Sequence, residues 1–168
     1  MTAADRPTSP EITFRPVGPD DDELLYRIYA STRQEELAPL GWSAEQSEAF
    51  LRMQFRAQSV HYSTYYGDSE FLLVLRDGEP AGRLYVHRQG DEIRLIDIAL
   101  LPEHRNAGIG SRLLRDLLSE AAASGRRVTI HVEQYNPALR LYERLGFRHI
   151  SDHGVYYLME WSPATGGD

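Results

Sequence analysis

The chain has 168 residues, of which 42% are hydrophobic and 26% are charged, and these values are typical of one globular domain. Its 25 acidic and 18 basic residues give a net charge of −7, which disfavours binding to nucleic acid or to an anionic membrane. Cys and Lys are both absent, which excludes a disulfide framework, a thiol nucleophile and a Schiff-base lysine.

The N-terminal half predicts a strand, two helices and then three strands. Residues 1–10 and 162–168 are predicted to be flexible tails around a single domain over residues 11–161. A short strand over 11–16 precedes a helix that opens with acidic residues at 20–22, and Ser43 with Gln46 forms a capping box for a second helix. A strand over 70–76 is followed by strands 81–88 and 92–101, which form a hairpin centred on Gly90.

The C-terminal half alternates helices and strands. Helix 108–124 ends at Gly125 and precedes a strand over 127–133. Asn136 and Pro137 are predicted to open another helix, with Asn as the cap and Pro at the first position. Strands 147–151 and 155–161 complete the order β-α-α-β-β-β-α-β-α-β-β. The fold class is therefore α/β (mixed α+β), a central mixed twisted sheet of about seven strands flanked by about four helices.

No segment of the sequence indicates export or a membrane span. The longest apolar runs have about four residues, and a membrane helix needs roughly 20. The polar, Pro-containing start has no apolar core of the kind found in a signal peptide. We therefore expect a cytoplasmic protein that binds neither membrane nor nucleic acid.

The stretch from Ile98 to Ser111 reads IALLPEHRNAGIGS and carries most of the chemical information. An apolar strand ends at Pro102, and Gly108 and Gly110 stand where the next helix begins. Small residues there let backbone N–H groups converge on one point, and the helix dipole adds positive potential. This pattern favours a phosphate or pyrophosphate site. An ordinary turn that needs glycine explains the same residues, so both interpretations stay open on physical grounds alone.

Two segments resemble motifs of the GCN5-related N-acetyltransferase (GNAT) superfamily. Residues 105–110, RNAGIG, resemble the acetyl-CoA loop of that family, and residues 136–147, NPALRLYERLGF, resemble its Asn…Leu-Tyr-Glu…Gly-Phe signature. Both stand in the family's order, and the element order extends the resemblance over residues 11–161. The resemblance implies the GNAT fold and acetyl-CoA as co-substrate, with no metal.

The resemblance also implies how the chain would hold the cofactor. The backbone of the strand before the loop would pair with the pantetheine arm, and N–H groups of the loop would hold the pyrophosphate. Arg105 can add a charge-assisted hydrogen bond to the phosphates. The strand residues are Ile98, Ala99 and Leu100, and the loop residues are Asn106, Ala107, Gly108, Ile109, Gly110 and Ser111.

Tyr142 and Asn136 come from the second motif. The resemblance implies that Tyr142 stands near the thioester sulfur and protonates the leaving thiolate, a step for which a phenol is suited. A strand N–H at a bulge would stabilise the oxyanion. The spacing from Asn136 to Tyr142 is one residue shorter than the family's usual spacing. Asn136 therefore either contacts the pantetheine or the acceptor, or only caps the helix.

Asp97 is the first candidate for a catalytic base. Alternation along its strand predicts that it shares a face with Ile93 and Leu95, so a carboxylate interrupts an apolar row. A hairpin centred on Gly90 would place Arg83 directly across from it. An ion pair would lower the pKa of Asp97 and make it a poor base. A structural or substrate-orienting role is therefore favoured over general-base catalysis.

His131 is the second candidate, because a histidine titrates in the right range for base catalysis. In some family members that acetylate N-terminal amines, a Glu occupies the corresponding position. A histidine held by hydrogen bonds without a catalytic role is the alternative, and a water chain can replace a base altogether.

The sequence thus predicts an N-acetyltransferase, an acyltransferase that moves an acetyl group from acetyl-CoA to a primary amine in a ternary complex. The acceptor is expected to be a small molecule or a peptide. The acidic N-terminal half, with 14 acidic residues against 7 Arg over residues 1–80, favours a cationic acceptor. A noncatalytic acyl-CoA-binding sensor or regulatory module on the same fold is the alternative. Homodimers are frequent in the family, so a homodimer is compatible with the resemblance.

Overall fold

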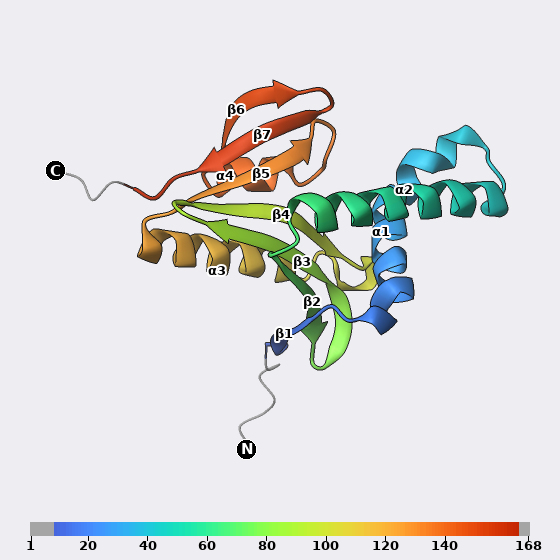
Figure 1. Ribbon diagram of the computed structural model, residues 1–168, viewed down its shortest axis with the longest axis horizontal. Helices are drawn as coiled ribbons and strands as arrows, with labels where there is room; N and C mark the ends of the chain where they lie inside the picture. Colours follow the sequence, from blue (N-terminus) through green and yellow to red (C-terminus); the bar gives the residue numbers. More distant parts are fainter. Residues whose placement is uncertain (1–8, 165–168) are drawn as a thin grey trace, which may run out of the picture.

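The computed structural model describes residues 9–164, and its helices and strands follow the predicted order (Figure 1). Residues 9, 10 and 162–164 carry no helix or strand, and the rest of the two predicted tails, 1–8 and 165–168, lies outside the described residues. The main elements are β1 (Ile12–Pro16), α1 (Asp22–Leu37), α2 (Ala44–Tyr65), β2 (Glu70–Arg76), β3 (Glu79–Gln89), β4 (Glu92–Leu100), α3 (Ile109–Ser124), β5 (Arg127–Glu133), α4 (Leu139–Arg144), β6 (Arg148–His153) and β7 (Tyr156–Trp161).

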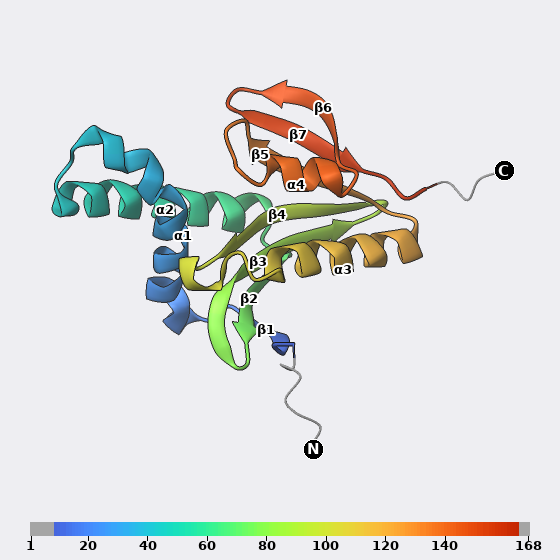
Figure 2. The ribbon, with the colours of Figure 1, turned by 180° about the vertical axis from the view of Figure 1, so that it is seen from behind.

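One seven-stranded sheet with the order β1-β2-β3-β4-β5-β7-β6 forms the centre of the molecule. Only β4 and β5 pair in parallel, and the other neighbouring strands are antiparallel. Helices α1 and α2 cover one face of the sheet, and α3 and α4 cover the other, as the two opposite views show (Figures 1 and 2). The predicted fold class is confirmed.

Apolar residues at helical spacing decide which face of each helix is buried. Helix α3 places one stripe, which includes Leu113, Leu117 and Ala121, against apolar residues of β3, β4 and β5. Helix α1 buries Leu25 and Ile28 against Leu73 and other residues of the opposite sheet face. The sheet is therefore packed on both sides, as expected for a strand pair joined by a helical crossover. No helix within residues 9–164 is both long and apolar enough to cross a membrane.

The β3–β4 hairpin differs from the predicted one at its turn. Gln89 pairs with Glu92, so the turn has two residues, Gly90 and Asp91, and is not centred on Gly90 alone. Gly90 has φ +58°, and a two-residue hairpin turn commonly needs a positive φ at its first central position. The turn shifts the register by one residue and a bulge farther along β4 shifts it by another, so Arg83 pairs with Ala99 and not with Asp97.

A β-bulge at Ile96 changes which side of the sheet the end of β4 presents. Leu95 pairs with Val86, whereas Asp97 pairs with Tyr85, so Ile96 is an extra residue. The prediction that Asp97 shares a face with Ile93 and Leu95 is therefore wrong. Past the bulge, Asp97 faces α1 and α2 together with Tyr85.

Helix α4 is shorter than predicted. It begins at Leu139, and its N-cap is Ala138, because residues 134–138 form turns. Asn136 still performs a capping function, since its Oδ1 accepts a hydrogen bond from the N–H of Ala138 at 2.8 Å. Pro137 lies in the turn before the helix and not at its first position.

Candidate active site

The parallel pair β4–β5 separates part of the way along the sheet. Pairing runs from Glu92 with Arg127 to Leu95 with Ile130 and goes no further, although β4 continues to Leu100 and β5 to Glu133. We call the space between these two strand ends the β4–β5 opening. It lies at the carboxyl ends of the strands, where open α/β sheets bind their ligands.

Two residues of β4 present backbone groups to the β4–β5 opening. Leu101 donates its N–H to Ala81, which precedes Gly82 in β3, at 2.8 Å. Because backbone direction alternates along a strand, Leu100 and Ile98 aim their N–H and C=O groups away from β3, and Ala99 aims its groups toward β3. Of the three strand residues predicted to bind pantetheine, Ile98 and Leu100 are therefore the ones placed for backbone pairing with a ligand.

The loop before α3 presents a row of N–H groups. Arg105 donates its N–H to Pro102, and Arg112 donates its N–H to Gly108. Within the described chain, the backbone N–H groups from Asn106 to Ser111 have no protein acceptor. Asn106 and Gly108 have φ of +60° and +81°, a left-handed geometry that turns successive N–H groups inward. A row of unpaired N–H groups at a helix N-terminus is able to bind an anion.

The guanidinium of Arg105 is used within the protein. Its Nε donates to the carbonyl of Leu100 at 2.9 Å, and its Nη2 donates to Oγ of Ser31 at 3.1 Å. Arg105 thus connects the loop to the end of β4 and to α1. Its predicted bond to a phosphate stays a prediction.

Tyr142 lies on α4 and is almost fully buried, with 4% of its surface exposed. Its ring packs edge-on against Phe147 with a centroid separation of 5.6 Å. Burial raises the pKa of the phenol, and the charge of Asp97 adds to the rise, so the two groups lie within electrostatic reach of each other. No residue of the described chain hydrogen-bonds to the hydroxyl, which leaves a protonated phenol with a free donor.

Asp97 and Arg83 form an ion pair on the α1 and α2 face of the sheet. Arg83 is 3% exposed, and its Nε donates to the Asp97 carboxylate. Its Nη2 donates to Oε1 of Gln58 in α2 at 2.9 Å. Although the predicted register is wrong, the predicted ion pair is confirmed, because diagonal neighbours on one face stay within reach of a long side chain. Asp97 is 23% exposed at its side chain and can receive a further donor.

Tyrosines from three elements surround this pair. Burial raises the pKa of Tyr62 in α2, and Asp97 raises it further. Burial also raises the pKa of Tyr29 in α1. Tyr156 of β7 adds to the rise at both phenols, so it lies near each of them. We call Tyr29, Tyr62 and Tyr156 the tyrosine cluster.

An ion pair between Arg33 and Glu133 joins α1 to the end of β5. Arg33 Nη2 lies 2.9 Å from Glu133 Oε1, and Arg33 Nη1 lies 3.2 Å from Glu36 Oε2. Burial lowers the pKa of Arg33, but Glu133, Tyr29 and Glu36 outweigh this effect and raise it. Arg33 is therefore a permanent cation between two carboxylates. Of these, Glu133 belongs to the β4–β5 opening and Glu36 does not.

His131 lies on β5, on the same face as Glu133, because the two are separated by one residue. Arg94 Nη1 lies 2.8 Å from its Nδ1. Since a guanidinium can only donate, Nδ1 accepts and the neutral ring carries its proton on Nε2. Burial, Arg94 and His153 all lower its pKa. This contact counts against His131 as the base, because the lone pair of the unprotonated nitrogen, Nδ1, already accepts a hydrogen bond.

Asn136 has part of its side chain engaged. Its Oδ1 caps Ala138, and its own N–H donates to the carbonyl of Glu133 at 2.9 Å. The structure therefore supports the capping interpretation for the oxygen. The side-chain NH₂ group is what remains for a ligand.

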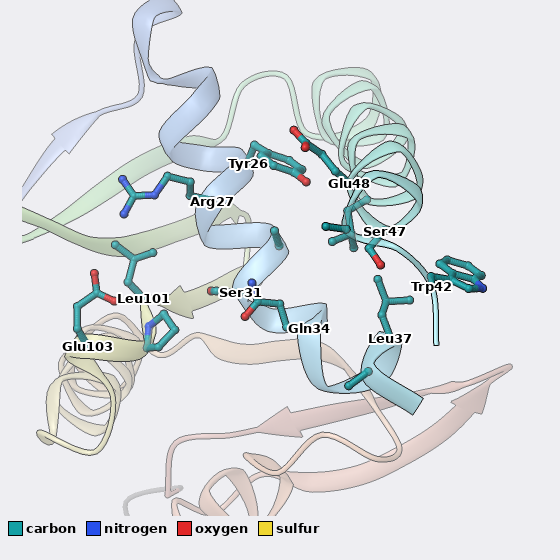
Figure 3. A pocket seen from close by; sticks show the side chains of 15 residues that line it. Tyr26, Arg27, Ser31, Gln34, Leu37, Trp42, Ser47, Glu48, Leu101 and Glu103 are labelled. Carbon is teal, nitrogen blue, oxygen red and sulfur yellow. The ribbon is translucent and has the colours of Figure 1, made fainter. Parts of the chain in front are cut away.

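A further concave surface, separate from the β4–β5 opening, lies between α1, the first turns of α2 and residues 101–103 (Figure 3). Its volume is about 600 Å³. Helix α1 contributes Arg27, Ser31 and Gln34, whereas Tyr29 and Arg33 on another face of the same helix lie at the opening. The part of its wall formed by residues 101–103 continues along the chain into the loop before α3.

Sequence reasoning missed Gln58, Arg33 and Tyr29 as site residues. The spacing of Tyr29 and Arg33 on one helix face was visible, but nothing indicated that this face meets the end of β5. The contact of Gln58 with Arg83 spans 25 residues, and side-chain pairs of this kind depend on how α2 lies across the sheet. Among the described residues, no group of three or more His, Cys, Asp or Glu is placed to hold a metal ion.

Solved structures of acetyltransferases share this fold. The structure is similar to that of PaiA N-acetyltransferase from Thermoplasma acidophilum in complex with coenzyme A, with a TM-score of 0.68 and 21% identity over 90% of this chain and 99% of that one. At this identity the likeness shows the fold.

The family follows from sequence. A model of the acetyltransferase (GNAT) family matches residues 25–147, and the chain belongs to this family. It is 32% identical over 148 residues to mycothiol acetyltransferase of Corynebacterium glutamicum strain R, covering 82% of this chain and 51% of the relative. It is 34% identical over 68 residues to [ribosomal protein bS18]-alanine N-acetyltransferase of Haemophilus influenzae, covering 40% of this chain and 47% of that one. The chain thus spans about half the length of the curated relatives it matches.

Proposed function

We propose that this chain transfers the acetyl group of acetyl-CoA directly to a primary amine, with Tyr142 as the general acid. One observation carries the proposal: a buried phenol with a free hydroxyl lies within electrostatic reach of Asp97 at the β4–β5 opening. The row of free N–H groups at the start of α3 belongs to the same end of the sheet. A thioester held between the strands, with its phosphates at α3, would place its sulfur beside this phenol.

The residues divide the chemistry as follows. The acceptor ammonium first gives one proton to water, and the neutral amine nitrogen then attacks the thioester carbon, while a backbone N–H at the bulge of β4 stabilises the oxyanion. As the carbon–sulfur bond breaks, Tyr142 donates its proton to the thiolate. The nitrogen gives up its second proton through water, and this proton restores the phenol of Tyr142. Asp97, held by Arg83, orients the amine.

Burial of Tyr142 is consistent with this assignment. A phenol whose pKa is raised stays protonated throughout the physiological range. It therefore does not compete as an anion with the thiolate. The proton is therefore in place on the phenol when negative charge develops on the departing sulfur.

The test is acceptor-dependent release of free thiol from acetyl-CoA, read with a thiol reagent against a panel of primary amines. The chain contains no Cys, so the protein contributes no background. We expect turnover with at least one amine and a loss of about 10²- to 10⁴-fold in kcat in Tyr142→Phe. The dissociation constant of acetyl-CoA, measured by calorimetry, should stay unchanged.

The sensor alternative gives a different result. A noncatalytic acyl-CoA-binding module would bind acetyl-CoA and release no thiol with any amine. Binding of acetyl-CoA without turnover across the panel would overturn the enzymatic assignment in favour of that alternative. An unchanged kcat in Tyr142→Phe would overturn the role of Tyr142 alone.

A further inference from the structure

Two carboxylates flank the β4–β5 opening, one on each diverging strand. Asp97 lies two residues past the last paired residue of β4, and Glu133 lies three residues past the last paired residue of β5. At about 3.3 Å per residue, Glu133 stands about 10 Å beyond the end of the pairing. The two carboxylates therefore occupy separate positions, with Asp97 beside Tyr142 and Glu133 farther out.

The cations near the opening are already engaged. Arg83 is held by Asp97 and Gln58, and Arg33 is held by Glu36 and Glu133. A carboxylate on the acceptor would have to displace one of these partners, at the cost of leaving a half-buried acid without its counter-charge. A second positive charge on the acceptor would instead share Glu133 with Arg33, because a carboxylate has room for more than one donor.

Within the tyrosine cluster, the ring of Tyr29 already faces the Arg33 guanidinium at 5.7 Å, so the rings of Tyr62 and Tyr156 are the ones that strengthen this preference. Tyr29 and Tyr62 are largely withdrawn from water, which raises the pKa of both phenols. Aromatic faces attract cations, more strongly where water is excluded. The unpartnered hydroxyl of Tyr142 marks the reacting end of the site. A second positive charge on the acceptor would therefore lie farther out, toward Glu133.

We propose that Glu133 is a specificity-determining residue that reads a second positive charge on the acceptor, so that the preferred acceptor is a dicationic amine and not an amino acid zwitterion. Arg33 positions Glu133 from α1, and the reacting amine lies at Asp97. This inference rests on the proposed function, because it assigns the acceptor side of the same site.

The test uses three compounds that share a four-carbon chain and differ only at the far end: 1,4-diaminobutane, butylamine and 4-aminobutanoate. Each is titrated into the protein saturated with coenzyme A, which prevents turnover, and the dissociation constant is measured by calorimetry. We expect 1,4-diaminobutane to bind at least about tenfold more tightly than 4-aminobutanoate, with butylamine between them.

Two matched variants locate the preference. Glu133→Gln keeps the side-chain volume and should bring the three dissociation constants close together. Glu36→Gln removes the other carboxylate that contacts Arg33, on the outer side of α1, and should keep the order. Equal binding of the three compounds to the original protein, no binding of any of them, or an unchanged order in Glu133→Gln would each overturn the inference. Failure of coenzyme A itself to bind would instead overturn the proposed function, and this inference with it.

Discussion

Arg83 shows how a buried charge connects stability to the site. It is 3% exposed and lies between Asp97 of β4 and Gln58 of α2. Desolvation acts against the charge, but the contact with Asp97 keeps the pKa of Arg83 raised. Removing one partner of a buried pair leaves the other charge uncompensated, and that loss exceeds the net contribution of the pair.

We therefore expect Arg83→Met to lower the free energy of unfolding by about 3 kcal/mol. Arg88 is the control, because it lies on the same strand and contacts Glu70 and Glu120 at the surface. Arg88→Met should cost under about 1 kcal/mol. Urea unfolding measures both variants. Equal decreases in the free energy of unfolding would show that the buried ion pair of Arg83 contributes no more to stability than the surface contacts of Arg88.

Asp21 gives the protein a specific sensitivity to acid. It accepts two hydrogen bonds from Arg15, each at 2.8 Å, and one from the N–H of Gly18 at 2.7 Å. The bond to Arg15, then the bond to Gly18, lower its pKa from 3.8 to about 2. Because the pKa is lower in the folded state, the stabilisation is complete above about pH 4 and is lost as the pH falls toward 2.

Asp21→Asn should accordingly destabilise the protein by about 1–2 kcal/mol at pH 7. The difference from the original protein should shrink between pH 4 and pH 2 and vanish at the lower end. Thermal unfolding across this pH range measures it. Asp20→Asn is the control, since Asp20 is exposed, and its effect on stability should be small.

At the scale of elements, two glycines near the carboxyl end of β4 serve different purposes. A Cβ on Gly82 would collide with the backbone of Ala99 and Leu100 in β4, so glycine is needed there for strand packing. A Cβ on Gly110, in the first turn of α3, would meet only Cδ1 of Leu100 at an ordinary 3.8 Å. The protein therefore has room for a methyl group at Gly110.

Gly110→Ala consequently separates folding from binding. We expect unfolding stability to stay the same or to rise slightly, because alanine favours helix. If the phosphates of coenzyme A contact the N–H groups at the start of α3, the new methyl group should weaken coenzyme A by about tenfold or more, measured by calorimetry. Unchanged affinity would show that the phosphates bind elsewhere. Gly82→Ala should instead lower stability in the absence of any ligand.

The elements themselves could be predicted well, and their relative placement could not. Caps, turns and apolar periodicity are local, so the order and type of the main helices and strands followed from the sequence. The register of β3 against β4 depended on one turn residue and on the bulge at Ile96. Because β4 has apolar residues on both faces, its hydrophobic pattern gave no sign of the bulge. The predicted ion pair of Arg83 with Asp97 was correct although the register was wrong, because long side chains can reach a diagonal neighbour on the adjacent strand. The contact of Arg33 with Glu133 had no local signal at all.

At the scale of the whole molecule, the site belongs to neither side of the sheet alone. Helices α1 and α2 supply Tyr29, Arg33, Gln58 and Tyr62 from one face, and α4 supplies Tyr142 from the other. The β4–β5 opening is where groups from the two sides approach each other through a sheet that is closed elsewhere. A ligand in this opening would form hydrogen bonds with the ends of β4 and β5 that do not pair with each other.

Binding of coenzyme A should therefore stabilise the whole fold while protecting a small part of it. At a ligand concentration about 100 times its dissociation constant, linkage adds about 2.7 kcal/mol to the free energy of unfolding, which thermal unfolding reports. Hydrogen exchange measured by mass spectrometry shows where the ligand acts. We expect slower exchange at Asn106–Ser111, whose N–H groups lack protein acceptors, and at Ile98 and Leu100. Exchange in β2, remote from the opening, should change only where global unfolding limits it. Stabilisation without local protection at residues 106–111 would place the cofactor at another surface, such as the concavity between α1 and α2.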